Sequence, residues 1–240
     1  MEYYFADEKN VNKEKNEIII SGFEFKHLVK VLRKKAGDEI TLTDGRLNVY
    51  RCKIENVYRN ELHCKIIDAA RELFEPEVSI NLFLSPLRNM SRFEFAVEKA
   101  VELGVKQIQP VLTKYTIQKN DFSLAKAERL KKIILSAMCQ SQRCHLPEFK
   151  NAVTISELTE LTKNDKCKIV MYEFSSGNES VNSVYIYKEV DLLIGPEGGF
   201  SEDEIELLKN YGWITQSLGK RKLRAETAAA VSVFKLTGIL

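Results

Sequence analysis

The hydrophobic pattern of the chain changes at Pro76, and this change limits the possible folds more than any other feature. Before Pro76, short stretches of alternating apolar and polar residues are separated by turn residues, which is typical of a small β-barrel. After it, strand-length apolar runs alternate with stretches of helical periodicity. Pro76 cannot continue a central strand and its neighbours are charged. We therefore expect two domains, residues 1–72 and 73–240.

The first domain is predicted to consist mainly of strands. Asp44-Gly45 is a hairpin signal between strands expected at 39–42 and 49–57. Leu62, Cys64 and Ile66 alternate with polar residues, which predicts a strand over 61–67. Further strand residues are expected at 17–20, and one or two helical turns at 25–32.

The second domain is predicted to be a mostly parallel sheet covered by helices on both faces. Strands are expected at 78–84, 107–111, 168–172, 190–194 and 213–218, and helices from Ser91, over 124–142, from Ser201 and over 226–240. Ser91 with Glu94, and Ser201 with Glu204, have the spacing of capping boxes. Ligands of such sheets bind at the carboxyl ends of the strands.

Composition and charge limit the function classes. The chain has 240 residues and a net charge of only +2, but basic residues gather at 33–35 and 220–224. Each cluster is either a solvated surface or a contact for a phosphate backbone. No run approaches the roughly 18 apolar residues of a membrane span, and the first residues do not form a signal peptide. We expect a cytoplasmic protein that does not bind membranes.

The five cysteines have no framework spacing, which indicates reduced thiols. Cys139, Cys144 and His145 lie close together in sequence and suggest a metal site. Because no second pair of ligands accompanies them, we predict no metal.

Two glycine-containing segments stand where a ligand of the sheet would lie. Gly195-Pro196-Glu197-Gly198-Gly199-Phe200 follows a predicted buried strand, and 218–228 links the last strand to the last helix. Glycine lets a backbone approach a ligand closely, although both segments are also compatible with purely structural turns. The chain lacks both the P-loop lysine and the G-x-G-x-x-G pattern, which argues against a dinucleotide or nucleotide phosphates.

Two polar groups are candidates for RNA contacts. Gln140 and Arg143 lie at the end of a predicted helix and could hydrogen-bond a base or a phosphate, or could interact only with the helix dipole. His27 and Arg33 lie beside a basic turn, where a surface or structural role is the alternative.

Taken together, these segments resemble the RsmE family, the 16S rRNA uridine methyltransferases of the SPOUT class. The resemblance covers nearly the whole chain and rests on 27–33, 98–105, 140–143, 194–200 and 218–228. The sequence departs from the family pattern at Val101, at Met138-Cys139, at Gln142 where glycine is usual, and at Lys222 where an aliphatic residue is common.

The resemblance implies an N-terminal PUA-like β-barrel that binds RNA and a SPOUT α/β domain with a C-terminal trefoil knot. It also implies a homodimer that methylates N3 of a uridine in 16S rRNA of the small ribosomal subunit, with S-adenosylmethionine as cofactor. The implied cofactor-binding residues are Met171, Tyr172, Gly195, Pro196, Glu197, Gly198, Gly199, Leu218, Gly219, Leu223, Arg224 and Thr227. The implied RNA-binding residues are His27, Arg33, Gln140 and Arg143.

A mechanism is expected for two of these positions. Uracil N3 loses a proton before it attacks, and the resulting charge spreads onto the carbonyl oxygens. Arg224 is the candidate cation for that charge, and Glu226 is the candidate base or a residue that orients Arg224.

Three other functions compete with this hypothesis. A related enzyme could methylate a ribose 2′-hydroxyl or another RNA. The protein could be a non-catalytic RNA-binding or ribosome-assembly factor, or a two-domain α/β protein of unrelated function. The motif of the first domain and the Gly-Pro-Glu-Gly-Gly form argue against the first alternative, and the glycine loops disfavour the non-catalytic factor.

Overall fold

The computed structural model describes residues 2–117, 124–175 and 187–238 of the chain. It contains two compact units. The N-terminal unit comprises Met1–Glu75 and Leu135–Leu146, and the C-terminal unit comprises Pro76–Ile134 and Pro147–Leu240. The last two residues of the helix expected over 226–240 lie outside the described residues.

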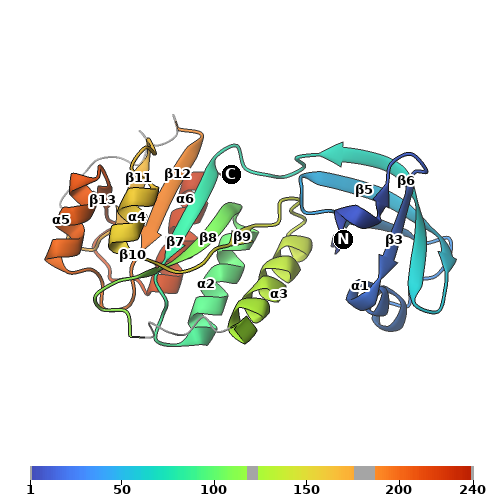
Figure 1. Cartoon of the computed structure of the whole chain (residues 1–240), viewed down its shortest axis with the longest axis horizontal. Helices are drawn as coiled ribbons and strands as arrows, with labels where there is room; N and C mark the ends of the chain where they lie inside the picture. The colour runs from blue at the N-terminus through green and yellow to red at the C-terminus, as the bar shows by residue number, and fades with distance from the viewer. Residues whose placement is uncertain (1, 118–123, 176–186, 239–240) are drawn as a thin grey trace. The chain divides into compact units, whose positions relative to one another are not determined.

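The N-terminal unit is a curled six-stranded sheet with the strand order β1-β4-β5-β6-β3-β2 (Figure 1). All neighbours are antiparallel except β1 and β4. Its inward-facing apolar residues, among them Ile18, Leu42 and Ile54, form a core that is fully buried. The strands are β1 (Tyr4–Phe5), β2 (Val11–Asn12), β3 (Glu17–Ser21), β4 (Glu39–Thr43), β5 (Asn48–Val57) and β6 (Glu61–Arg71).

The hairpin expected at Asp44-Gly45 is confirmed between β4 and β5. The Asp44 carboxylate accepts hydrogen bonds from the backbone N–H of Arg46 at 2.8 Å and from the Asn48 side chain at 2.7 Å. Besides the end of helix α3 (Leu124–Gln140), the described part of this unit contains the short helical segments η1 (Glu8–Asn10), α1 (Gly22–Lys26) and a π-helical turn η2 (His27–Val31). The last two confirm the helical turns expected near 25–32.

The C-terminal unit contains a parallel seven-stranded sheet in the order β10-β8-β7-β12-β11-β13, with β9 paired to β8. This confirms the parallel α/β fold predicted from the alternating pattern. The strands are β7 (Ser79–Leu84), β8 (Val105–Leu112), β9 (Glu148–Phe149), β10 (Val153–Thr154), β11 (Lys168–Met171), β12 (Glu189–Ile194) and β13 (Ile214–Gln216).

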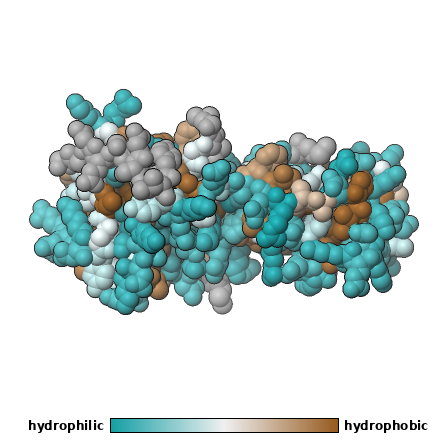
Figure 2. All heavy atoms as spheres, turned by 90° about the horizontal axis from the view of Figure 1, so that it is seen from above, coloured by the Kyte–Doolittle hydropathy of each residue, from teal (hydrophilic) through white to brown (hydrophobic). Residues whose placement is uncertain are grey.

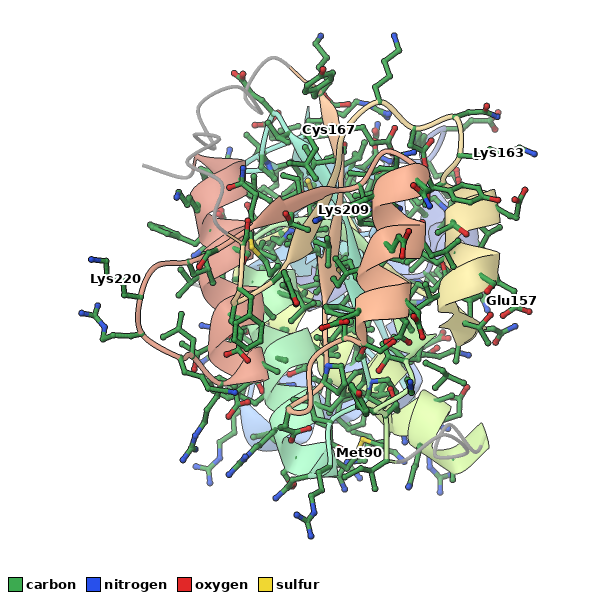
Figure 3. The ribbon with its side chains drawn as sticks, turned by 90° about the vertical axis from the view of Figure 1, so that its left-hand side faces the viewer. Met90, Glu157, Lys163, Cys167, Lys209 and Lys220 are labelled. Carbon is green, nitrogen blue, oxygen red and sulfur yellow. The ribbon has the colours of Figure 1, made fainter. Side chains whose placement is uncertain are left out.

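Helices cover both faces of this sheet (Figures 1 and 3). Side chains of α4 (Ile155–Leu161) and α5 (Glu202–Asn210) share a core with Phe83, Val170 and Leu193 of the strands. Helix α2 (Met90–Glu102) packs on α6 (Ala225–Thr237), and both contact the central strand β7 or its neighbours β8 and β12. Helix α3 spans Leu124–Gln140.

Of the two capping boxes predicted at helix starts, the structure confirms one and shows that the other is wrong. Ser201 and Glu204 do form a capping box at the start of α5. Ser91 does not cap α2; the cap is Asn89, whose side chain accepts the backbone N–H of Ser91 at 2.8 Å. An asparagine side chain serves this position as well as serine does, so the spacing of Ser91 and Glu94 was misleading.

Hydrophilic side chains cover most of the surface seen in Figure 2, with small hydrophobic patches among them. Within the described ranges, no helix is both long and apolar enough to span a membrane.

Candidate functional site

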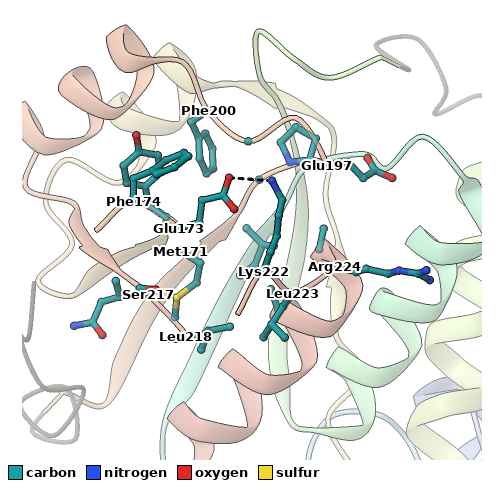
Figure 4. A pocket seen from close by; sticks show the side chains of 18 of the residues that line it. Met171, Glu173, Phe174, Glu197, Phe200, Ser217, Leu218, Lys222, Leu223 and Arg224 are labelled. Atoms are coloured by element: carbon teal, nitrogen blue, oxygen red, sulfur yellow. Dashed lines mark hydrogen bonds and ion pairs between the residues drawn. The ribbon is translucent and has the colours of Figure 1, made fainter. Parts of the chain in front are cut away.

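A pocket of about 340 Å³ lies at the carboxyl ends of β11, β12 and β13. Met171, Ile194 and Gln216, the last residues of these strands, all line it. The two glycine-containing segments form the rest of its wall (Figure 4). The lining residues come from three separate segments of the chain, and the first and last of them, Met171 and Ala228, are 57 positions apart.

The backbone of the pocket depends on glycine, as Gly195 and Gly219 illustrate. A Cβ added to Gly195 would lie 2.7 Å from the ring of Phe200, so the ring packs directly on the loop backbone. Gly219 has a φ of +110°, a conformation that side chains with a Cβ rarely adopt. These two positions fix the paths of the loops on either side of the pocket.

The carboxylates of Glu197 and Glu204 anchor the first glycine loop, residues 195–200, through hydrogen bonds to backbone N–H groups. Both carboxylate oxygens of Glu197 lie 3.2 Å from the backbone nitrogen of Arg88, which donates to them. Glu204 accepts the backbone N–H of Lys114 at 2.7 Å and also closes the capping box. The Glu197 carboxylate is thus held by the backbone of the segment after β7, although Glu197 lines the pocket.

The second loop carries an ion pair that crosses the pocket. Lys222 Nζ lies 3.1 Å from Glu173 Oε1, and Glu173 follows the end of β11 (Figure 4). Lys220 points away from the body of the protein into solvent (Figure 3). Arg224 lines the pocket and precedes the first residue of α6, but its side chain does not cap that helix. The basic cluster at 220–224 is therefore divided between solvent and pocket.

All but one of the residues expected to bind the cofactor line this pocket; Thr227, in the first turn of α6, does not. The structure adds lining residues that sequence reasoning missed. They include Phe174, Gln216, Ser217, Arg221 and Lys222. The available signal was position at or shortly after a strand end for the first three, and membership of the basic cluster for the last two.

Glu226 lies in the first turn of α6 and is 8% exposed. Its Oε1 is 3.8 Å from Arg92 Nε of α2, and its Oε2 has no hydrogen-bond partner in the described part of the chain. Between residues that the structure describes, no hydrogen bond or ion pair joins Glu226 to Arg224. Glu226 is thus a buried carboxylate with one uncommitted oxygen.

All four residues expected to bind RNA belong to the N-terminal unit. His27 lies between two rings, with centroids 6.2 Å from Tyr4 and 6.3 Å from Phe23. Arg33 is exposed in a left-handed conformation, and Gln140 is exposed at the last position of α3.

Arg143 differs from the other three because it is buried. Its side chain is 4% exposed, and its Nη2 lies 2.7 Å from Glu75 Oε2. Glu75 also accepts the backbone N–H groups of Cys144 and His145, at 2.8 and 2.9 Å. Burial alone would raise the pKa of Glu75, but Arg143 and these hydrogen bonds lower it below its ordinary value. Arg143 and Glu75 together fix the segment after α3.

The cysteines near this segment are buried thiols. Burial raises the pKa of both Cys139 and Cys144 to about 12, which keeps them protonated. No group of three or more His, Cys, Asp or Glu side chains in the described ranges could hold a metal ion.

The chain matches two known protein families. The family described as "RNA methyltransferase domain" matches residues 75–236, and "RNA methyltransferase PUA domain" matches residues 20–67. Similar proteins include the ribosomal RNA small subunit methyltransferase E of Mesomycoplasma hyopneumoniae, 35% identical over 82% of this chain and 90% of its own length. The protein of that name from Bacillus subtilis is 32% identical over 95% of this chain and 93% of its own length.

Solved structures agree with these matches. The ribosomal RNA small subunit methyltransferase E of Neisseria gonorrhoeae, solved bound to S-adenosylmethionine, has a TM-score of 0.85 at 25% identity, covering 97% of this chain and 95% of its own. A methyltransferase from Legionella pneumophila, solved with the same cofactor, has a TM-score of 0.85 at 27% identity, covering 98% and 96%. The chain belongs to the RNA methyltransferase family that includes ribosomal RNA small subunit methyltransferase E.

Proposed function

We propose that this protein methylates N3 of a specific uridine in 16S rRNA of the small ribosomal subunit, using S-adenosylmethionine. The observation that carries the proposal is the pocket at the ends of β11, β12 and β13, built by glycine loops in a chain of the RNA methyltransferase family. Relatives of the same fold bind S-adenosylmethionine.

The lining of the pocket fits this cofactor. Met171, Leu218 and Leu223 provide apolar walls for an adenine ring, and the backbones of the two glycine loops can approach it closely. Glu173 provides a carboxylate that can accept hydrogen bonds from hydroxyl or ammonium groups. When bound, S-adenosylmethionine supplies an electrophilic methyl group.

Arg224 and Glu226 are proposed to act on the uracil. Arg224, at the pocket, would place a fixed positive charge beside a uracil oxygen as N3 loses its proton. Glu226 is the proposed proton acceptor because one of its oxygens is uncommitted and no hydrogen bond or ion pair to Arg224 is found among the described residues; Glu226 follows the pocket residue Ala225 but does not itself line the pocket. Thr227 remains a proposed cofactor contact that the lining of the pocket does not support.

The N-terminal unit is proposed to be a PUA-like barrel that binds the RNA. His27, Arg33 and Gln140 supply side chains that can reach a base or a phosphate. Arg143 is proposed to contribute indirectly, because its guanidinium is buried against Glu75. We retain residues 1–72 and 73–240 as the proposed RNA-binding and methyl-transfer domains, with segment 135–146 added to the RNA-binding side.

The proposed trefoil knot and homodimer each have supporting observations. From β13 at the edge of the sheet, the chain returns past β11 to α6, which contacts β7 and β12; a knotted path requires such a crossing. Val231 and Phe234 leave about 40% of their surface exposed on α6. An apolar helix surface of this kind suits a second copy of the chain. The proposed location is the cytoplasm, where ribosomes are assembled.

A methyl-transfer assay tests the proposal. Small ribosomal subunits from a strain that lacks the native enzyme are incubated with the protein and labelled S-adenosylmethionine, and the nucleosides of the digested RNA are separated. We expect label in N3-methyluridine from 16S rRNA. Label in a 2′-O-methylated nucleoside would instead indicate the ribose reaction. Absence of both label and cofactor binding would indicate a non-catalytic RNA-binding protein.

A further inference from the structure

A second cavity lies within the N-terminal unit, and the mechanism described above does not use it. It measures about 210 Å³ and is formed by the end of β1, η1, the end of β3 and the start of α1. Its apolar floor includes Phe5, Ile19, Ile20 and Leu135. All lining residues belong to the N-terminal unit.

Four polar side chains line this cavity: Asp7 pairs with Lys9, and the other three have no partner among the described residues. The side chains of Asn10, Ser21 and Glu24 make no hydrogen bond or ion pair with any residue that the structure describes. Ser21 precedes the first residue of α1 but does not cap it. Glu24 is half-buried, and this burial raises the pKa of its carboxyl group, against the opposing effect of His27. A half-buried carboxylate without a donor is better stabilised by a ligand that supplies one.

An aromatic ring stands at the same cavity. Phe23 is 79% exposed, far more than a ring that serves the core, and it neighbours His27. Lys26, Lys30 and Arg33 follow within ten residues and are exposed. Exposed rings flanked by cations are the usual elements of single-stranded RNA recognition: the rings stack on bases, and the cations meet phosphates.

We propose that this cavity binds one unpaired guanine base of the RNA, stacked on Phe23 and read by Glu24. Guanine presents two parallel donors, N1–H and the 2-amino group, which match the two oxygens of a carboxylate. Uracil and adenine each offer a single donor position there, so they bind less well. This inference deepens the proposed function, since it rests on RNA as the substrate.

The test uses the full-length protein and fluorescent oligouridines that carry one central guanosine, adenosine or inosine. We expect the guanosine probe to bind about 5-fold more tightly than the adenosine probe, or better. Inosine lacks the 2-amino donor and should lose most of that preference. Glu24→Gln should abolish the preference and leave binding of the adenosine probe unchanged. Phe23→Ala should weaken binding of every probe by about 5-fold or more.

Matched controls come from the same unit. Phe74 is 71% exposed and Glu14 is exposed, so Phe74→Ala and Glu14→Gln should change neither affinity nor base preference. Thermal unfolding of each variant confirms that it is folded.

The inference is overturned if the wild type shows no guanine preference, if Glu24→Gln keeps it, or if Phe74→Ala equals Phe23→Ala. It is also overturned if the Phe23 and Glu24 variants weaken binding to intact subunits but not to oligonucleotides, which indicates that a protein side chain fills the cavity. Methyl transfer by the wild type is measured separately. Normal transfer without guanine preference rejects only this inference, whereas guanine preference without transfer rejects only the proposed function.

Discussion

Two segments that carry candidate ligand-binding cations, 143–146 and 219–224, differ in how the structure uses those cations. In the first, the guanidinium of Arg143 is buried against Glu75, and the same carboxylate holds two backbone N–H groups. In the second, Lys222 meets Glu173 across a pocket with 73% of its side chain exposed, and Arg224 lines the pocket. Burial decides which cation supports the fold and which can serve a ligand.

The largest expected effect lies in the second segment. Arg224→Ala should lower the turnover of methyl transfer by at least about 10²- to 10³-fold, because the positive charge beside the developing oxyanion is lost. Cofactor affinity should stay within a few-fold, as measured by calorimetry. Arg221→Ala, at a neighbouring residue that also lines the pocket, is the control. Near-normal turnover in Arg224→Ala would refute the assignment.

In the first segment, the effect should fall on stability. Arg143→Ala leaves the Glu75 carboxylate buried without its cation and should lower the free energy of unfolding by about 3–5 kcal/mol. Lys222→Ala removes an exposed pair and should cost less than about 1 kcal/mol. Urea denaturation of both variants checks the contrast, and equal losses would show that burial does not separate the two segments.

A second buried carboxylate, Asp191, extends this comparison, because it forms no ion pair with a cation in the described part of the chain. It accepts a hydrogen bond from Asn81 at 2.8 Å, and burial, reinforced by Asp165, raises its pKa to about 7. In the unfolded chain the group ionises near pH 4. Native Asp191 therefore holds a proton that the unfolded chain loses, so this group's contribution to stability falls as the pH rises from about 4 to 7 and then stays constant.

Asp191→Asn should remove this pH dependence. Relative to the wild type, the variant should gain about 1–3 kcal/mol of unfolding free energy between pH 5 and pH 8, since one pKa unit corresponds to about 1.4 kcal/mol. Glu128→Gln is the control, because the pKa of Glu128 is lowered by Lys131 and Glu128 is not among the groups that shift the pKa of Asp191. A difference between variant and wild type that does not change with pH would contradict the assignment.

For the exposed cations of the N-terminal unit, we expect a smaller effect, on substrate binding. Arg33→Ala should raise the apparent KM for RNA about 3- to 10-fold with little change in kcat. The slope of log affinity against log salt concentration should also fall by about 1, the value for one lost phosphate contact. Arg51→Ala, an exposed arginine on β5, should change neither. An unchanged KM in Arg33→Ala counts against the RNA contact.

The smallest effect is expected at Gln142, where the family usually has glycine. Its φ is +60°, a conformation that costs residues with a Cβ about 1–2 kcal/mol. Gln142→Gly should therefore raise stability by up to about 1 kcal/mol, part of the gain being offset by the freedom of glycine in the unfolded chain. Ser136→Gly, at an exposed position inside helix α3, should lower stability instead. Thermal unfolding distinguishes the two signs.

The sequence alone determined the parallel sheet, the strands of three or more residues, the Asp44-Gly45 hairpin and the capping box at Ser201, because period and turn chemistry are local properties. The two-residue strands β1, β2, β9 and β10 were not predicted. It also located both glycine segments of the pocket, since their close backbone approach requires that residue type.

Only the tertiary structure decided which polar side chains became internal. Sequence spacing placed Gln140 and Arg143 within residues 73–240, whereas the fold groups 135–146 with the N-terminal unit and buries Arg143 against Glu75. Glu173 and Lys222 are separated by 48 intervening positions. They meet only because β11 and β13 are parallel neighbours, so that the segments following both strands leave the sheet on the same side. The partners of a charge, and hence its burial and pKa, depend on contacts that local pattern does not encode.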